Sequence, residues 1–243
     1  MTSITKPKFS HDGRSDIYDY VERHGAMEPE AVREAVNMEH RAFGHHVAIL
    51  KRDQVLEKSN GKLRVAFEGG AEEEYSTEAV SFTIRQAREE DLTGLVGAIR
   101  EAIGGGKYVR AETVADVVDN EGVLLRHNKI EARIFFVACV DSDVVGWVHL
   151  KHVDLDKLRH TAQLTVGVLD QYRGKGIGSH LLERGLNWAA QQEFEKIENA
   201  LPATNEQAIE FLKSRDFEVD AVREDHYKLN GEYVDEVMMM KQL

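Results

Sequence analysis

The 243-residue sequence has one cysteine and three prolines, and it contains no long run of apolar residues. A single cysteine excludes a disulfide framework and a multi-cysteine zinc site. It also fits a reducing compartment, so we expect a cytoplasmic protein. Three prolines argue against an array of proline-rich linkers. No apolar stretch approaches the ~18 residues that cross a bilayer, and the first residues lack the apolar block of a secretory signal, so we expect no membrane contact.

The composition is that of a folded chain, with 42% hydrophobic and 30% charged residues, and the length allows one large domain or two unequal ones. The formal net charge is −12. Residues 1–68 carry 11 basic and 11 acidic side chains, so the whole excess of acid lies in the residues that follow. A chain with this balance is not a general binder of polyanions, and a nucleic acid would meet the N-terminal segment.

Residues 14–68 carry three short helical patterns and then a two-stranded pattern. The helices are predicted at about 15–25, with Ser15 as its cap, and at about 28–37 and 39–53. Asn60-Gly61 predicts a hairpin turn before the alternating residues Leu63, Val65 and Phe67. This order resembles the winged helix-turn-helix domain, whose third helix is the recognition element. The resemblance implies that the third helix exposes Arg41, His45, His46, Lys51 and Arg52. Winged helices also dock proteins, so DNA contact, partner docking and a homodimer all stay open.

Residues 69–79 are rich in glycine and glutamate and have no periodicity, and we predict a linker there. From residue 80 to 243 the patterns run strand, helix, helix, three strands, helix, strand, helix and two strands, which predicts an α/β domain. The first two helices are expected at about 88–103 and 112–128. A hairpin is expected around Asp141-Ser142-Asp143, with Cys139 buried in an apolar strand.

A glycine-rich turn follows the strand predicted at 162–169 and precedes a helical pattern. Gly174, Gly176 and Gly178 fall at alternate positions in this turn. Glycines allow positive φ and remove the obstruction of a Cβ, so several backbone N–H groups can point at one anion. The N-terminus of the following helix adds about half a positive charge. The sequence therefore predicts a cradle for a phosphate or a pyrophosphate.

Spacing separates the known kinds of phosphate cradle. A nucleotide P-loop needs a glycine where Leu169 stands, and a dinucleotide fingerprint needs its third glycine where Ser179 stands. The pattern Arg173-x-x-Gly176-x-Gly178 instead resembles the acetyl-coenzyme A motif of the GCN5-related N-acetyltransferase (GNAT) superfamily. The resemblance covers residues 80–243 and includes Thr83 to Ala87, Asn205 and the closing segment 231–238. It implies a mixed, mostly antiparallel sheet with two splayed parallel strands, flanked by helices.

The resemblance also implies how acetyl-coenzyme A, the expected co-substrate, would be held without a metal. The pyrophosphate would meet the N–H groups of a six-residue run: Gly174, Lys175, Gly176, Ile177, Gly178 and Ser179. Arg173 and Asn205 would also lie at the cofactor. The backbone of Val166 and Val168 would bind the pantetheine arm between the splayed strands. The Val168 N–H would further support the oxyanion that forms as an amine attacks the thioester.

The residues for proton transfer depart from a common pattern of the family. Where several members carry a base glutamate this sequence has Ala200, and where they carry an acid tyrosine it has Leu212. Glu198 would share a strand face with the first of these positions, so it is a candidate base. Tyr227 and Tyr233 of the last hairpin are candidate acids. His149 and His152 remain alternatives that would act through water.

The expected function is transfer of an acetyl group to an amine, which is a protein lysine, a protein N-terminus or a small amine. The acidic residues Glu193, Glu195 and Glu198 favour a cationic acceptor. Because the usual base and acid are missing, a second reading stays open: a DNA-binding regulator that senses an acyl-coenzyme A without turnover. In a third, the N-terminal unit is an arm that delivers the enzyme to a protein substrate.

Overall fold

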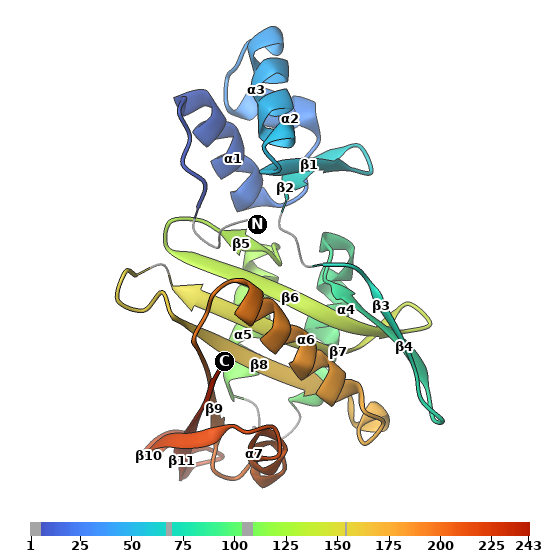
Figure 1. The fold of residues 1–243 in the computed structure, drawn as a ribbon, viewed down its shortest axis with the longest axis vertical. Coiled ribbons are helices and arrows are strands. Elements are labelled where there is room, and N and C mark those ends of the chain that lie inside the picture. The colour runs from blue at the N-terminus through green and yellow to red at the C-terminus, as the bar shows by residue number, and fades with distance from the viewer. Residues whose placement is uncertain (1–5, 67–69, 104–108, 154) are drawn as a thin grey trace.

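The computed structural model describes residues 6–66, 70–103, 109–153 and 155–243. A small unit of three helices and a hairpin lies at one end of a large twisted sheet, and helices cover both faces of that sheet (Figure 1). The helices within the described ranges fall short of the length and apolar character that a bilayer crossing requires.

The N-terminal unit has the elements expected for it in the expected order. They are α1 (Asp12–His24), α2 (Pro29–Ala35), α3 (His40–Arg52), β1 (Leu56–Ser59) and β2 (Lys62–Val65). Asn60 and Gly61 both take positive φ at the β1–β2 turn, which is the conformation that tight hairpins need. Met27, in the segment between α1 and α2, bridges to Leu63 of the hairpin. Helices and hairpin therefore share one small core, in which Tyr18 and Leu50 are buried.

Two details of the N-terminal prediction are wrong. Helix α1 begins before Ser15, because the His11 side chain accepts the backbone N–H of Gly13 and caps the helix there. His46 is buried against the ring of His11, so it is not an exposed residue of α3. The other four predicted side chains of α3 are exposed. Phe67 lies outside the described residues.

The large sheet consists mainly of antiparallel strands. Its strands are β3 (Glu73–Ser76), β4 (Ser81–Gln86), β5 (Arg126–His127), β6 (Glu131–Val140), β7 (Asp143–Val153), β8 (Thr161–Val168), β9 (Lys196–Pro202), β10 (Glu218–Leu229) and β11 (Glu232–Gln242). The spatial order is β10-β11-β9-β8-β7-β6-β4-β3, and β5 pairs with β6. Residues 73–76 were predicted as linker, but they form the edge strand β3, because they pair with residues 81–84 of β4.

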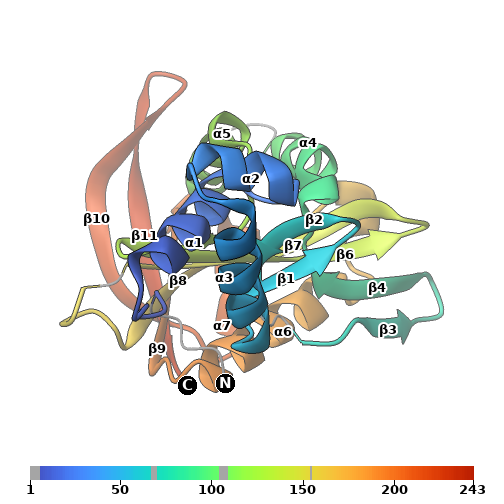
Figure 2. The same ribbon diagram turned by 90° about the horizontal axis from the view of Figure 1, so that it is seen from above.

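Helices cover the two faces of this sheet unequally. Helix α6 (Ile177–Gln191) packs on one face, where Trp188 contacts Phe136 of β6, and α4 (Leu92–Ala102) and α5 (Val109–Glu121) lie on the other (Figure 1). The short turn η1 (Glu89–Asp91) precedes α4, η2 (Asp170–Tyr172) precedes α6, and α7 (Glu206–Lys213) follows β9. The prediction of a helix to residue 128 is wrong, because α5 ends at Glu121 and β5 pairs with β6. The β10–β11 hairpin extends beyond the body (Figure 2), and most of β10 is exposed.

The N-terminal unit is docked on the sheet through buried polar groups. The Tyr18 hydroxyl of α1 lies 2.7 Å from Nδ1 of His127 in β5 and donates to the carbonyl of the same residue at 2.8 Å. Glu22 accepts the backbone N–H of His127 at 3.1 Å, and Arg126 donates to the Glu22 carbonyl at 3.0 Å. Buried polar groups with satisfied partners fix one arrangement, because separating them would leave each of them unpaired.

Candidate active site

The parallel pair β8–β9 separates after three residue pairs. The ladder joins Thr161 to Lys196 and ends at Gln163 and Glu198, although both strands continue. On its other edge β8 stays paired with β7 as far as Val168. The Leu169 N–H donates to Val145 of β7 at 2.9 Å, and the alternation of antiparallel bonds turns the N–H groups of residues 166 and 168 toward β9. The main chain of Val166 and Val168 therefore faces an open wedge.

The glycine turn closes the wide end of this wedge. Gly174 has φ +72° and Gly176, which precedes α6, has φ +87°. The N–H groups of Ser179 and His180 donate back to the Gly176 carbonyl, at 3.0 and 3.2 Å. Within the described part of the chain, no backbone acceptor takes the N–H groups of residues 174–178. The first N–H groups of a helix have no acceptor in the helix itself, and the helix dipole adds to their attraction for an anion.

Three of the predicted cofactor residues have structural partners of their own. The Arg173 side chain donates to the Val168 carbonyl at 3.0 Å and pairs with Asp170 at 2.7 Å, so it braces the turn. Ser179 gives its N–H to the helix and accepts Arg215 on its hydroxyl at 2.6 Å, so the prediction of a free N–H at this position is wrong. Asn205 is buried and caps α7 through the N–H of Ala208.

Between the splayed strands and the turn lies a cleft of about 420 Å³. Its lining combines the main chain of residues 166–168, glycines of the turn, and side chains of β9 and α7, among them Asn199, Leu201, Gln207 and Phe211. Apolar walls lead to a turn with unpaired N–H groups. The cleft therefore fits a ligand with a pyrophosphate and a long arm, as acetyl-coenzyme A has. Arg215, at the hydroxyl of Ser179, brings a cation to the same end, and sequence reasoning gave no signal for it.

A second cavity, of about 250 Å³, opens on the α5 face of the sheet. Its lining includes three cations, Arg110, Arg133 and Lys151, and no carboxylate among the residues that the structure describes. Arg133 is held by Glu121 at 2.5 Å, and Lys151 by Glu131 at 2.7 Å. Gln163 and Thr165 of β8 also line it, so this cavity abuts the strand that walls the cleft on the other face. The predicted preference for a cationic acceptor does not fit these walls, and Glu193 and Glu195 are exposed beyond α6.

His149 lies in the wall of the second cavity. It is fully buried, its Nδ1 lies 3.4 Å from the Thr165 hydroxyl, and its Nε2 has no partner within the described residues. Burial, together with the charges of Arg133 and Lys151, holds the pKa of His149 well below its usual value. The imidazole is therefore neutral at physiological pH.

A buried carboxylate, Glu236 of β11, lies opposite Pro202 at the end of β9. It accepts Arg110 at 3.1 Å, the Tyr227 hydroxyl at 2.5 Å and Arg223 at 3.0 Å. Burial alone would raise the pKa of Glu236, but the hydrogen bonds from Tyr227 and Arg110 outweigh it and lower the pKa. Burial and the bond to Glu236 raise the pKa of Tyr227 to about 12. Sequence reasoning did not single out Glu236, because its three hydrogen-bond donors lie on other elements, α5 and β10.

The other two predicted catalytic residues lie elsewhere. Tyr233 is 64% exposed near the tip of the β10–β11 hairpin, where its ring lies 5.2 Å from the Lys228 ammonium. Glu198 pairs with Lys196 at 3.0 Å and lines neither cavity. His152 is buried, and its Nδ1 lies 3.0 Å from the Thr161 carbonyl. Of the three residues first proposed for proton transfer, only Tyr227 contacts a residue of the second cavity's network.

Part of the chain resembles proteins of a known family. The model of the acetyltransferase (GNAT) family matches residues 107–217. The L-amino acid N-acetyltransferase AaaT of Escherichia coli is 28% identical over 109 residues, which span 43% of this chain and 65% of that protein. The L-methionine sulfoximine/L-methionine sulfone acetyltransferase of Pseudomonas aeruginosa is 27% identical over 145 residues, 58% of this chain and 82% of that protein.

Solved structures agree on the fold. A GCN5-related N-acetyltransferase from Kribbella flavida has a TM-score of 0.55 at 22% identity and covers 67% of this chain and 98% of its own. An acetyltransferase from Salmonella typhimurium, solved with acetyl-CoA, has a TM-score of 0.54 at 20% identity and covers 67% and 94%. Together the family match and the relatives support the GNAT superfamily, and these structures support its fold.

Proposed function

We propose that the chain is a GNAT N-acetyltransferase that takes acetyl-CoA in the cleft between β8 and β9. One observation carries the proposal. The wedge left by the short β8–β9 ladder presents the main chain of Val166 and the N–H of Val168, and it opens onto a turn whose N–H groups have no backbone acceptor among the described residues. Acetyl-CoA would supply the activated acetyl thioester. Most of the acceleration would come from positioning, because the attacked carbon is already reactive.

Each part of the cleft has a task that its chemistry suits. The N–H groups of residues 174–178 would hold the pyrophosphate, and Arg215 would add a positive charge beside it. The main chain of Val166 would bind the amide groups of the pantetheine arm, as a neighbouring strand would. The Val168 N–H would donate to the carbonyl oxygen of the acetyl group, and the Arg173 bond to the Val168 carbonyl fixes that peptide in place.

The second cavity would take the acceptor amine. His149 is neutral and has an unpartnered Nε2, so it would accept a hydrogen bond from the amine and orient its lone pair. Glu236 would position Arg110 rather than move a proton, because three donors already occupy its oxygens. Tyr227 keeps its proton at neutral pH, but its hydroxyl already donates a hydrogen bond to Glu236. We therefore assign Tyr227 the same supporting task.

We propose further that the acceptor carries a carboxylate as well as an amine, as an α-amino acid does. Three cations without a lining carboxylate make the second cavity a site for an anion. Arg133 is held on several sides, whereas Arg110 is 31% exposed and remains available. The relatives named for L-amino acids and for L-methionine sulfoximine support this acceptor class.

Release of free coenzyme A tests the proposal. The protein is incubated with acetyl-CoA and a panel of free amino acids, polyamines and lysine-containing peptides, and the products are identified by mass spectrometry. We expect turnover with free amino acids and none with polyamines. Turnover with polyamines or peptides alone would refute the acceptor class. Tight acetyl-CoA binding with no turnover on any amine would instead favour the acyl-coenzyme A sensor.

The N-terminal unit has a separate proposal. We propose that it is a winged-helix-like contact module that binds through the outer face of α3, where Arg41, His45, Lys51 and Arg52 are exposed. Few cations and the acidic sheet domain weaken an interaction with DNA, since phosphate neutralisation supplies most of such affinity. A salt-dependent shift of duplex DNA by the full chain, lost in Arg41→Glu/Arg52→Glu, would establish DNA as the partner.

A further inference from the structure

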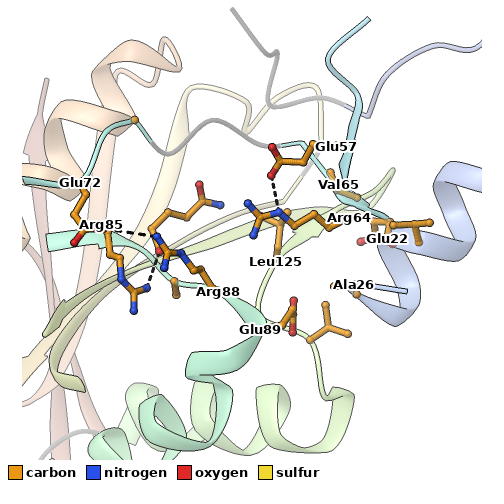
Figure 3. Close-up of a pocket in the computed structure, with 16 residues that line it drawn as sticks. Glu22, Ala26, Glu57, Arg64, Val65, Glu72, Arg85, Arg88, Glu89 and Leu125 are labelled. Carbon is orange, nitrogen blue, oxygen red and sulfur yellow. Dashed lines mark hydrogen bonds and ion pairs between the residues drawn. The ribbon is translucent and has the colours of Figure 1, made fainter. Parts of the chain in front are cut away.

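A third cavity lies where the N-terminal unit meets the sheet domain, and it shares no lining residue with the cleft or with the acceptor cavity. Its volume is about 200 Å³. One wall comes from the α1–α2 turn and the β1–β2 hairpin, with Gly25, Ala26 and Arg64. The other comes from the end of β4, the start of η1 and residues 123 and 125 (Figure 3). The space suits a small molecule and is too small for a nucleotide or a peptide.

Two arginines from opposite walls line this cavity, and both already pair with carboxylates. Arg64 bonds Glu57 through Nε at 2.5 Å, and Arg88 lies 3.6 Å from Glu72 and 3.5 Å from Glu90. Within the described residues, neither arginine makes a hydrogen bond with its terminal nitrogens. Figure 3 shows the Arg64 guanidinium beside Glu57 and, on the other side of the cavity, Arg88 joined to Glu72 by a dashed line. By contrast, both terminal nitrogens of Arg85 donate hydrogen bonds to Asp91, at 2.6 and 2.9 Å.

A carboxylate also faces this cavity. Glu89 belongs to the sheet domain, and a Cβ built on Gly25 of the N-terminal unit would meet its carboxyl carbon at 3.4 Å. Burial raises the pKa of Glu89, although a hydrogen bond from the Leu124 N–H and the charges of Arg126, Arg133 and Arg64 act in the opposite direction. The other acids of the wall are engaged. Glu57 holds Arg64, Glu72 lies 3.6 Å from Arg88, and Glu22 accepts His127 and Asn128.

We propose that this cavity binds a small zwitterion with the chemistry of an α-amino acid, its carboxylate at Arg64 and Arg88 and its ammonium at Glu89. The charges of the walls argue against the two simpler ligands. A dicarboxylate would place an anion against Glu89, and a diamine would place a cation against two arginines. Bidentate contact with guanidinium groups is the usual way in which proteins hold a carboxylate. The inference does not depend on the proposed transferase activity.

Such a ligand would join the two parts of the chain. Arg64 belongs to the N-terminal unit, whereas Arg88 and Glu89 belong to the sheet domain. The wall at residues 123–125 also reaches the acceptor cavity, because Arg133 donates to the carbonyls of Val123 and Leu124 at 2.9 and 3.3 Å. Arg133 lines that second cavity. Occupation of the third cavity is therefore expected to change the rate of acetyl transfer as well as the stability of the docked arrangement.

Calorimetry with the full chain tests the site, using the standard amino acids one at a time without acetyl-CoA. The variants are Arg88→Gln and Glu89→Gln, and the matched control is Arg100→Gln, an exposed arginine on α4 that pairs with Asp116 and Asp119 and does not line the cavity. We expect at least one amino acid to bind the wild type and the control equally, and each pocket variant about tenfold more weakly, because each loses one charged contact. Binding that both pocket variants retain at full strength would overturn the proposal.

A second set of measurements separates this site from the acceptor cavity and needs no pocket variant. The amine and the carboxylic acid that match the bound amino acid, each lacking one charged group, are expected to bind the wild type far more weakly. Equal binding of either would overturn the zwitterion. Arg110→Gln is expected to raise the KM of an acceptor while leaving this calorimetric signal intact. Loss of the signal in Arg110→Gln would assign the ligand to the acceptor cavity instead.

Discussion

Trp147 occupies the space that a side chain at Gly167 would need. A Cβ built on Gly167 would clash with the Trp147 indole, and the two residues are direct partners in the β7–β8 ladder. Gly167 stands between Val166 and Val168, whose main chain faces the cleft. The position of the indole therefore helps to fix the path of β8, which forms one side of the wedge.

Gly167→Ala is expected to lower the free energy of unfolding by ~1–3 kcal/mol, as overpacking does, and to weaken acetyl-CoA binding because β8 must shift. Chemical denaturation and calorimetry measure the two effects. Gly97→Ala is the matched control, since a Cβ there meets nothing within 4 Å. If Gly167→Ala kept both stability and cofactor affinity, the rigid placement of β8 would be wrong.

Gly176→Val is expected to abolish measurable acetyl-CoA binding, because a branched side chain at φ +87° distorts the turn that presents the N–H groups. Gly231→Val provides the comparison. It carries the same kind of strain, at φ +90°, but lies in the β10–β11 turn with open space around it. We expect calorimetry to show wild-type affinity for Gly231→Val. Normal binding by Gly176→Val would argue against the turn as the pyrophosphate site.

Arg110→Gln is expected to raise the KM for an amino acid by roughly tenfold or more, since a charged hydrogen bond contributes about 1.5–3 kcal/mol. Its kcat should change less, because Arg110 contacts neither wall of the cleft. Steady-state kinetics with the amine that lacks the carboxylate supplies the internal comparison. For that acceptor the variant and the wild type should have the same KM. A parallel loss on both acceptors would show that Arg110 does not bind a carboxylate.

The acid stability of the chain should report on His149. Its pKa is lowered in the folded state by burial and by Arg133 and Lys151, with Arg110 in the same cavity. Below a pH of about 6.5, His149 is protonated in the unfolded chain but stays neutral in the folded chain. The free energy of unfolding therefore decreases as pH falls, by up to ~1.4 kcal/mol per pH unit. His149→Gln should remove this part of the pH dependence. Denaturation at pH 7 and at pH 5 measures it, and identical slopes for both proteins would contradict the assignment.

The sequence predicted those parts of the site that depend on local geometry. A strand, alternate glycines and a helix within one short segment specify a turn with exposed N–H groups, and the turn at 174–178 has that form. Local patterns also predicted most helices and strands of the sheet domain. Residues 73–76 were not predicted as a strand, because a polar edge strand has the composition of a linker. The pairing of these residues with β4 is not visible in their own sequence.

The residues that sequence reasoning missed are those defined by distant partners. Glu236 gathers Arg110, Tyr227 and Arg223 from other elements, and Arg215 reaches the turn from the residues after α7. Asn205 matched the family pattern in place, but its carbonyl oxygen caps a helix. The cations that line the second cavity also went unpredicted, because net charge averages over a surface and a cavity selects a few side chains from it.

The short β8–β9 ladder has a thermodynamic consequence for the protein as a whole. Without acetyl-CoA the sheet is unfinished, because the main chain of Val166 and the N–H of Val168 have no strand partner on the β9 side within the described residues. A bound pantetheine arm would act as a surrogate strand and complete the seam between the two halves of the sheet. The melting temperature would then rise with the supply of cofactor, by the equivalent of about 2.7 kcal/mol at a hundredfold excess over Kd. The resistance of this protein to unfolding would thus follow the acetyl-CoA level around it.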